Sequence, residues 1–314
     1  MDRLRRLPSG FVRAVQIAVA VGLMAWLWQA ADGAEAARHL AGAQPVWLFA
    51  ALAALTAQTI LSALRWRVTA AQLGIAIDGG TAVREYYLSQ IVNQALPGGV
   101  LGDAGRAVRA RAQAGLLASG QAVAFERLAG QIAIFALLVV AFVVTLAVPG
   151  GLDWPVWAIW PVASVVGLGV AVPSILWSVA RVAPGAAGAA LIRLGQNLRL
   201  CLFAPEVRGR QLILSLGTAF ANVAGFMCCA AAIGAPIPPG AALALVPLIL
   251  FTMVIPITIS GWGLREGAAA ALLPLAGLTA AEAMAASVAF GLVFLASSLP
   301  GIVVVLLDRP RRAI

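Results

Sequence analysis

The sequence is poor in charge and contains no lysine at all. Only 11% of its 314 residues are charged, whereas 62% are hydrophobic. Soluble globular proteins carry about a quarter charged residues. A chain this apolar has too little polar material to cover a water-facing surface, so lipid must solvate much of it. A soluble enzyme or soluble binding module is therefore excluded.

Histidine and cysteine are equally scarce. The single histidine, His39, and the cysteines Cys201, Cys228 and Cys229 show no metal-ligand spacing and no disulfide framework. The sequence also lacks the glycine loop of a nucleotide-binding unit and a nucleophile with a positioned histidine. We therefore expect no metal, no cofactor and no enzymatic activity.

Long uncharged stretches are what the sequence has instead. A spanning helix needs roughly 20 apolar residues, and residues 14–31, 45–64, 128–149, 154–180 and 283–307 each meet this requirement. Residues 211–264 also lack charge, but they are too long for one crossing and must cross, turn and re-enter. The pattern predicts an all-α integral membrane protein with about 6–8 transmembrane helices, built as one membrane domain over residues 1–314.

The arginines predict the orientation of these helices. They gather before the first stretch, after the second, after the fourth and at the C-terminus, whereas the intervening loops are acidic or nearly uncharged. The positive-inside rule places the arginine-rich side in the cytoplasm, with both termini, in a bacterial inner membrane. The N-terminus imitates a signal peptide, but its apolar run is long enough to span, so an uncleaved first helix is expected. Because the arginines act as topology signals, no nucleic-acid partner is expected despite an isoelectric point of about 11.2.

The stretch after the second apolar segment has the pattern of a helix that ends at a break. Val83, Tyr87 and Ile91 recur at helical spacing, which predicts a helix over residues 81–95 lying at the membrane surface. Residues 93–106 then hold a proline and three glycines, including Gly99 and Gly102. Asp103 is placed to cap the helix that follows.

A second break lies in the other half of the chain, at residues 256–267. A proline is again followed by a polar residue and closely spaced glycines, here Ser260, Gly261 and Gly263, and then by Arg265 and Glu266. Broken or re-entrant helices in corresponding positions indicate an inverted repeat with a transport site between its halves.

Six charged residues accompany the two breaks. Their carboxylates and guanidinium groups balance, and they are Asp103, Glu126, Glu266, Arg106, Arg127 and Arg265. A helix that begins at membrane depth offers free N–H groups to phosphate or carboxylate, and arginine adds a forked contact. The set fits a structural ion-pair network, and it fits equally a gate whose arginines exchange carboxylates for a headgroup phosphate.

Several short motifs occur in a familiar order. They are Arg65-Trp66-Arg67, then Leu96-Pro97-Gly98-Gly99 with Gly102, Asp103 and Arg106, then Glu126-Arg127, and then Pro256 with Ser260-Gly261-Trp262-Gly263-Leu264-Arg265-Glu266. Over residues 13–307 the chain resembles the lysylphosphatidylglycerol synthase transmembrane-region family. The resemblance implies movement of a polar-headed lipid between leaflets, without nucleotide hydrolysis. It also implies that the charged residues beside the breaks form the headgroup site.

The resemblance leaves the lipid open. In two-domain members of that family a soluble aminoacyl transferase follows, whereas none is expected after Leu307 here. The lipid is therefore expected to be anionic, aminoacylated or glycosylated, and stand-alone relatives suggest hopanoid or glycolipid pathways. Two alternatives are a lipid-modifying enzyme in the membrane and an accessory protein. The latter would hold a lipid-biosynthetic enzyme through residues 181–210, where residues 185–200 could form an amphipathic helix.

Overall fold

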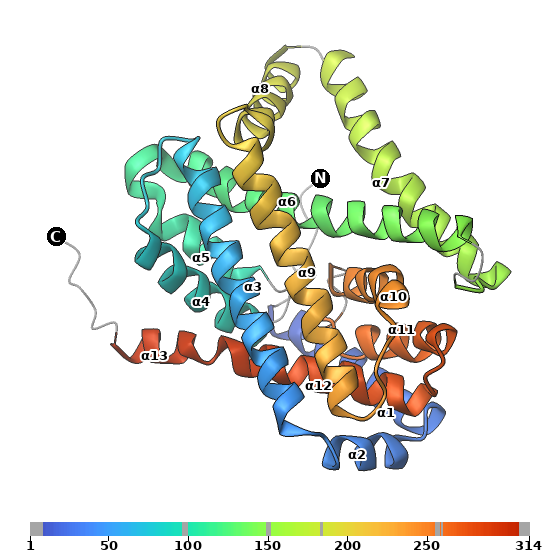
Figure 1. The fold of residues 1–314 in the computed structure, drawn as a ribbon. Helices are drawn as coiled ribbons and strands as arrows, with labels where there is room; N and C mark the ends of the chain where they lie inside the picture. Colours follow the sequence, from blue (N-terminus) through green and yellow to red (C-terminus); the bar gives the residue numbers. More distant parts are fainter. Residues whose placement is uncertain are drawn as a thin grey trace.

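A computed structural model describes residues 9–95, 100–148, 152–182, 185–254, 258 and 260–307. Within these ranges every regular element is a helix, which confirms the predicted all-α fold (Figure 1). The helices are α1 (Ser9–Ala30), α2 (Gly33–Ala41), α3 (Pro45–Ala71), α4 (Gly79–Ala95), α5 (Leu101–Arg109), α6 (Arg111–Ala147), α7 (Val156–Val182), α8 (Gly185–Phe203), α9 (Arg208–Ala232), α10 (Pro239–Phe251), η1 (Thr252–Val254), α11 (Leu264–Leu272), η2 (Leu273–Ala276), α12 (Ala280–Ser298) and α13 (Pro300–Leu307).

Several helices have the length and composition needed to cross a membrane. Among the described residues these are α3, α6, α9 and α12 continued by α13, and α1 with α2 adds a pair bent by 92°. The helices α7 and α10 contribute shorter apolar segments. The long uncharged stretch from residue 211 does turn back, because α9 ends at Ala232 and the thirteen-residue α10 follows. A multi-pass membrane protein is the architecture that results.

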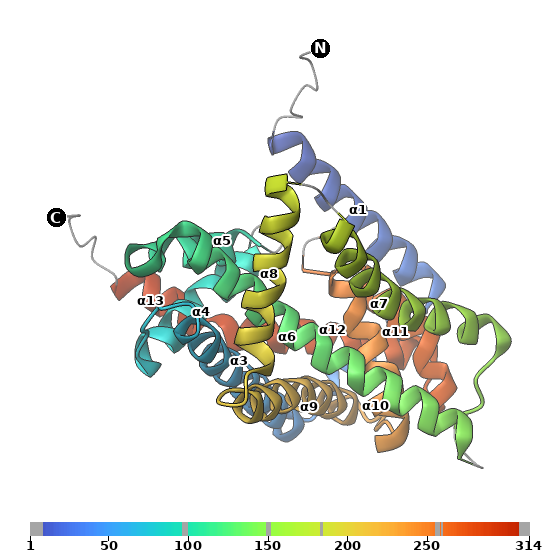
Figure 2. The ribbon, with the colours of Figure 1, turned by 90° about the horizontal axis from the view of Figure 1, so that it is seen from above.

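The centre of the molecule is an antiparallel pair formed by α3 and α9, which lie side by side in both views (Figures 1 and 2). At one end the Gln44 backbone N–H donates to the Ala232 carbonyl at 2.8 Å. At the other end the Gln211 amide donates to the Thr69 hydroxyl at 2.9 Å. Helices in lipid associate through close packing at small residues, and here Gly225 of α9 admits the Leu55 side chain of α3.

The two halves of the chain repeat one order of elements. A long helix is followed by a shorter one, a break, a nine-residue helix and a second long helix: α3, α4, α5, α6, and then α9, α10, α11, α12. The turn after each leading helix has the same residues at a constant offset, namely Gly74, Ile77, Gly80 and Ala82, then Gly234, Ile237, Gly240 and Ala242. Because α3 and α9 run antiparallel, the second unit is inverted relative to the first.

The repeated turn also has one backbone conformation. Gly74 and Gly234 have φ angles of 78° and 85°, in the left-handed region that glycine adopts without a Cβ clash. The residues that follow them donate to equivalent carbonyls, Ile75 to Ala70 at 3.0 Å and Ala235 to Ala230 at 3.0 Å. These are the C-terminal caps of α3 and α9.

The helix predicted at the membrane surface is present, but its position differs from the prediction. In the structure α4 packs against α3, α5 and α13. The apolar face that was expected to meet lipid instead meets α13, where a Cβ on Gly301 would lie 2.4 Å from the Tyr87 carbonyl and 2.7 Å from Ile91. The helical periodicity was therefore predicted correctly. The sequence did not predict that this helix packs against α13, from the far end of the chain.

The end of α7 and the start of α8 project from the bundle (Figure 1), whereas the start of α7 packs on the core through Ala158 and Val162. The helix predicted over residues 185–200 is present as α8. Its C-terminal end packs into the protein through Cys201 and Leu202, which are buried near Phe125 and Ala129 of α6. The remainder of α8 is largely exposed.

Candidate functional site

The charged residues of the first half meet around Glu126 of α6. Arg65 of α3 donates to Glu126 Oε1 from Nη2 at 2.7 Å and from Nε at 3.2 Å. Arg106 of α5 donates to Glu126 Oε2 at 3.3 Å and to Asp103 Oδ1 at 3.0 Å. Two buried guanidinium groups thus share one buried carboxylate, which is the arrangement in which buried charges are tolerated.

Arg106 is enclosed by aromatic rings as well as by carboxylates. Its guanidinium carbon lies 4.6 Å from the centre of the Trp66 ring and 4.5 Å from that of Tyr86. Desolvated cation–π contacts of this kind add to the ion pairs and fix the side chain in place. Arg106 is fully buried and therefore has a positioning role in this cluster.

Arg127 is the member of the cluster that remains accessible. Its Nη2 lies 2.6 Å from Asp103 Oδ2, yet its side chain is 46% exposed whereas that of Asp103 is 10% exposed. The adjacent Glu126 is fully buried, because neighbouring residues on a helix point in different directions. The Glu126-Arg127 pair therefore places its carboxylate inside the network and its guanidinium at the network's edge.

The start of α5 is held by α4. A Cβ on Gly102 would lie 2.0 Å from the Ser89 carbonyl oxygen, so only glycine allows the two backbones to approach this closely. The Gly102 N–H donates to the Asn93 side-chain oxygen at 2.8 Å, and the N-cap residue is Val100. The prediction that Asp103 caps this helix was wrong. Its carboxylate instead accepts from the Ser89 hydroxyl at 2.9 Å and from the two arginines.

Two charged residues at the second break form an ion pair that is separate from the first cluster. Arg265 pairs with Glu266, and both bind Ser287 of α12 at 3.0 Å. Glu266 also accepts from the Gly263 N–H at 2.6 Å, and this contact caps the start of α11. The Arg265 guanidinium carbon lies 5.1 Å from the Trp262 ring. Arg265 and Glu266 are both buried, so this pair fixes the turn.

The turn before α11 has an unusual backbone. Gly261 and Gly263 have φ angles of 78° and 85°, and Ser260 has a φ of 50°. A non-glycine residue in this left-handed region is uncommon and is worth a functional explanation. The Ser260 hydroxyl donates to the Asn93 carbonyl at 3.4 Å, which joins the two breaks. The predicted site residue Gly99, together with Pro97 and Pro256, lies outside the described residues.

The structure therefore divides the six predicted charged residues into two clusters. The first contains Asp103, Arg106, Glu126 and Arg127 and adds Arg65, a residue that the sequence placed in a motif but not in the site. The second contains only Arg265 and Glu266. With Arg65 included, the first cluster has three cations and two anions, so the predicted neutral balance does not hold there.

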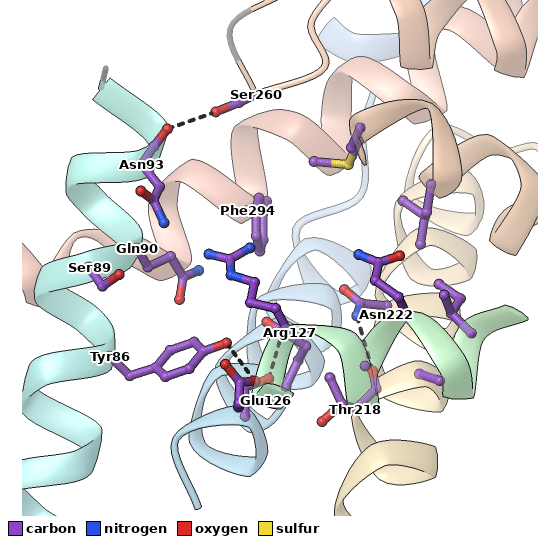
Figure 3. A pocket seen from close by; sticks show the side chains of 18 of the residues that line it. Tyr86, Ser89, Gln90, Asn93, Glu126, Arg127, Thr218, Asn222, Ser260 and Phe294 are labelled. Atoms are coloured by element: carbon purple, nitrogen blue, oxygen red, sulfur yellow. Dashed lines mark hydrogen bonds between the residues drawn. The ribbon is translucent and has the colours of Figure 1, made fainter. Parts of the chain in front are cut away.

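A cavity of about 560 Å³ lies beside the first cluster and extends to the second break (Figure 3). Arg65, Glu126 and Arg127 line it on one side, and Thr258, Ser260 and Phe290 line it on another. Its volume falls in the range of small-ligand pockets. In Figure 3 the Arg127 side chain extends between Gln90 and Phe294. Asp103, Arg106, Arg265 and Glu266 lie behind the wall and hold the lining residues in place.

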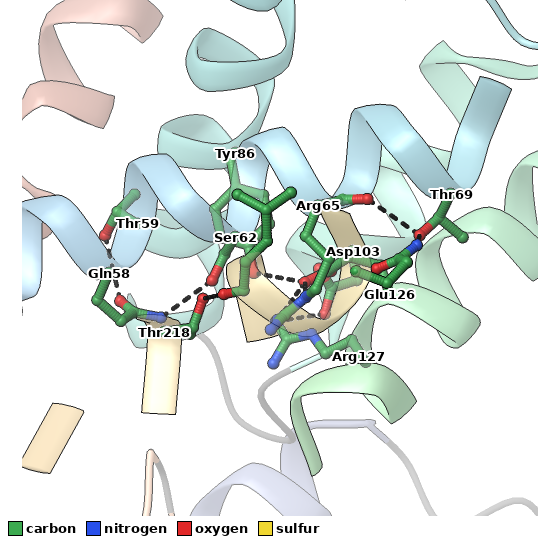
Figure 4. Close-up of polar contacts among 12 residues, drawn as sticks. Gln58, Thr59, Ser62, Arg65, Thr69, Tyr86, Asp103, Glu126, Arg127 and Thr218 are labelled. Carbon is green, nitrogen blue, oxygen red and sulfur yellow. Dashed lines mark hydrogen bonds and ion pairs between the residues drawn. The ribbon is translucent and has the colours of Figure 1, made fainter. Parts of the chain in front are cut away.

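Polar stripes on two apolar helices lead into this cavity. Gln58, Ser62, Arg65 and Thr69 lie on one face of α3, as Figure 4 shows. On α9 the matching polar positions, spaced by three or four residues, are Gln211, Ser215, Thr218 and Asn222. Apart from Arg65, which belongs to a motif, none of these residues was a predicted site residue. The signal that identifies them is a polar residue at every helical turn within an otherwise apolar span.

Several buried polar atoms in the wall have no protein partner. They are Arg65 Nη1, Gln90 Nε2, Asn93 Nδ2, Gln94 Nε2 and Thr258 Oγ1. A buried polar group without a hydrogen bond costs about 1–3 kcal/mol. Five such atoms around one cavity indicate that a polar ligand or water completes them. Among the described residues no group of three or more His, Cys, Asp or Glu side chains could hold a metal ion.

Comparison with known proteins gives one match. No curated protein and no solved structure matches the chain. A model of the family described as the lysylphosphatidylglycerol synthase transmembrane region matches residues 13–301. This match extends through both halves of the repeat, both breaks and the charged clusters. The chain therefore belongs to the lysylphosphatidylglycerol synthase transmembrane-region family.

Proposed function

We propose that this protein moves a polar-headed membrane lipid between leaflets, with the head passing through the cavity while the acyl chains stay in lipid. The observation that carries the proposal is the cavity itself. It lies among the long helices α3, α6, α9 and α12 and is lined by buried polar atoms that no protein group satisfies.

The depth of the cavity supports this proposal. Gln58 and Asn222 line it from near the middles of α3 and α9. The middle of a spanning helix lies near the centre of the bilayer, where unpaired polar groups are expensive and are retained for function. A polar cavity at that depth lowers the cost of carrying a headgroup across, which is the main barrier to lipid exchange. The proposal assigns no chemical reaction to the chain.

The arrangement of arginine and tryptophan supports an orientation with both termini in the cytoplasm of the inner membrane. Arg181 lies at the end of α7, and Arg193 and Arg199 lie along α8, so all three follow the outer end of α7. Exposed tryptophans lie at the other ends of the spanning segments, with Trp28 near the end of α1, Trp47 at the start of α3 and Trp157 at the start of α7. Arginine favours the cytoplasmic side and tryptophan favours the interface.

A leaflet-exchange assay tests the proposal. The purified full-length protein is reconstituted in vesicles that contain tail-labelled fluorescent phosphatidylglycerol or phosphatidylethanolamine, and dithionite quenches the outer leaflet. With active protein, nearly all fluorescence is quenched, whereas protein-free vesicles keep about half of it because the inner leaflet is protected. The same low quenching with both lipids in protein vesicles would reject translocation of these lipids.

A matched pair of variants links the activity to the cavity. Arg127→Ala removes the exposed guanidinium at the cavity wall, and we expect exchange to slow about tenfold or more, since a charged hydrogen bond contributes about 1.5–3 kcal/mol. Arg109→Ala removes a guanidinium of similar exposure, 41% against 46%, that pairs with Glu85 away from the cavity. Its rate should equal that of the wild type.

A further inference from the structure

We propose that the cavity selects a phosphodiester lipid whose head beyond the phosphate is uncharged and carries hydroxyl groups, and that it discriminates against lipids with a cationic head. This inference rests on the translocation function proposed above and adds the substrate class. Three independent features of the cavity wall lead to it: its charge, its occupied carboxylates and its free hydrogen-bond donors.

The charge of the wall favours one anion. Arg65, Arg106 and Arg127 face only two carboxylates, Asp103 and Glu126, in the first cluster. Among the described residues that line the cavity, the charged ones are Arg65, Glu126 and Arg127. The cluster therefore carries one net positive charge, although each of its arginines has a carboxylate partner. A single phosphodiester would neutralise it.

Each of the four carboxylate oxygens of the cluster already has a guanidinium partner. Glu126 Oε1 accepts from Arg65 and, at 3.3 Å, from the Tyr86 hydroxyl, while Oε2 accepts from Arg106. Asp103 Oδ1 accepts from Ser89 and Arg106, and Oδ2 contacts Arg127. An ammonium group in the cavity would have to share a carboxylate with a guanidinium group or displace it. A neutral head displaces none.

The unpartnered atoms around the cavity are mainly donors. The orientation of the Asn93 amide is fixed, because its oxygen accepts the Gly102 N–H and its Nδ2 must therefore face away from that bond. Asn93 and Gln90 are each 8% exposed, and Arg65, whose Nη1 is free, is 3% exposed. Phosphate oxygens and hydroxyl groups can accept from these donors, whereas an ammonium has three donors and no acceptor.

The part of the wall formed by Gln58 and Asn222 suits hydroxyl groups. Gln58 of α3 and Asn222 of α9 line the cavity with carboxamide groups. A carboxamide both donates and accepts, and so does a hydroxyl group. A head that carries hydroxyls beyond its phosphate can therefore bond on this side while its phosphate faces Arg127. A zwitterionic head presents its ammonium there, close to a cluster with excess positive charge.

A binding experiment with the full-length protein tests this selectivity. Delipidated protein in dodecyl maltoside is titrated with tail-labelled phosphatidylglycerol or phosphatidylethanolamine, which differ in the head beyond the phosphate. We expect phosphatidylglycerol to bind at least tenfold more tightly. Equal binding of the two lipids, or tighter binding of phosphatidylethanolamine, would overturn the selectivity. A soluble arm uses glycerol 3-phosphate as competitor. Competition at the concentration of the lipid itself would assign the site to a soluble anion and overturn the lipid inference.

Substitutions in the cavity wall should abolish the preference or weaken the binding of phosphatidylglycerol. Gln90→Glu keeps the oxygen that bonds Thr59 at 3.0 Å and replaces the unpartnered Nε2 with a carboxylate oxygen. We expect it to abolish the tenfold preference for phosphatidylglycerol, and Arg127→Gln to weaken phosphatidylglycerol binding about tenfold. Arg109→Gln, outside the cavity, should change neither. Unchanged selectivity in both Gln90→Glu and Arg127→Gln would overturn the assignment of this wall.

The two proposals fail in different ways. If phosphatidylethanolamine exchanges between leaflets as fast as phosphatidylglycerol, translocation holds and the selectivity is wrong. If neither lipid exchanges but phosphatidylglycerol binds preferentially in detergent, translocation is wrong, whereas the ligand class stands.

Discussion

Ser260 and Asn93 join the two halves of the repeat: the Ser260 hydroxyl donates to the Asn93 carbonyl at 3.4 Å across 167 positions of sequence. The same Asn93 caps α5 through its side chain and presents an unpartnered Nδ2. One residue at the end of α4 thus connects the first break to the second, positions the helix that carries Asp103 and Arg106, and contributes to the cavity wall.

Asn93→Ala should destabilise the protein by about 1–3 kcal/mol, because the Gly102 N–H would lose its acceptor in a buried place. Gln94→Ala is the matched control. It removes the neighbouring amide, whose Nε2 has no partner to lose. Thermal unfolding in detergent, followed by tryptophan fluorescence, measures both. A larger loss for Gln94→Ala than for Asn93→Ala would contradict this account of the cap.

Gly102→Ala should cost about 1–3 kcal/mol or prevent folding, because its Cβ would meet the backbone of Ser89 and only a shift of α4 or α5 could relieve the clash. Gly105→Ala tests the same helix. There the Cβ would meet only the end of the flexible Arg109 side chain at 3.0 Å. Alanine is the better helix former by about 1 kcal/mol, so this variant should be at least as stable as the wild type. Size-exclusion profiles and melting curves that rank the two variants the other way would refute the close-approach argument.

Arg265→Met should destabilise the protein more than Arg106→Met. In the second cluster Glu266 has ion pairing only with Arg265 among the described contacts, so the substitution leaves a buried, unpaired carboxylate, at a cost of about 3–5 kcal/mol. In the first cluster Glu126 keeps Arg65 and Asp103 keeps Arg127.

The double variant Arg265→Met with Glu266→Gln separates charge from packing. Removing the stranded charge should recover much of the stability lost in Arg265→Met, as read from the same melting curves. No recovery would mean that the cation–π contacts with Trp262 and Phe290, rather than the ion pair, hold this turn together.

The proposed orientation predicts opposite labelling of two engineered cysteines. Asp153→Cys, in the loop before α7, should react with a membrane-impermeant maleimide added outside intact cells. Arg193→Cys, on the exposed part of α8, should react only after permeabilisation. The wild-type chain is the control, since its cysteines include buried Cys201 and Cys229. The reversed pattern would place the termini on the other side of the membrane.

Features that depend on residues close together in the chain could be predicted from the sequence. Long apolar runs predicted the membrane helices, and proline with glycine predicted breaks after α4 and before α11. Each of these depends on residues within a few positions of one another.

The parts that the sequence did not predict depend on contacts between distant segments. Asp103 was expected to cap α5, but the Gly102 N–H donates instead to the side chain of Asn93 in the preceding helix. The helix α4 was expected at the membrane surface, but α13 covers it. Arg65 was left out of the site because its partner, Glu126, lies 61 positions away. A charge count in sequence cannot assign partners at that separation, so it balanced the wrong set.

The opposed directions of α3 and α9 limit how the whole chain can be threaded through a bilayer. For a unit to recur upside down in one continuous polypeptide, an odd number of crossings must separate the start of α3 from the start of α9, and in the proposed orientation α3, α6 and α7 supply three. Adding or removing a single crossing between the halves would turn the second half over and take Thr258 and Ser260 away from Arg127. Extra segments at either terminus carry no such penalty. Fusions at the ends should therefore leave the cavity intact, whereas one extra hydrophobic helix between α6 and α7 should dismantle it.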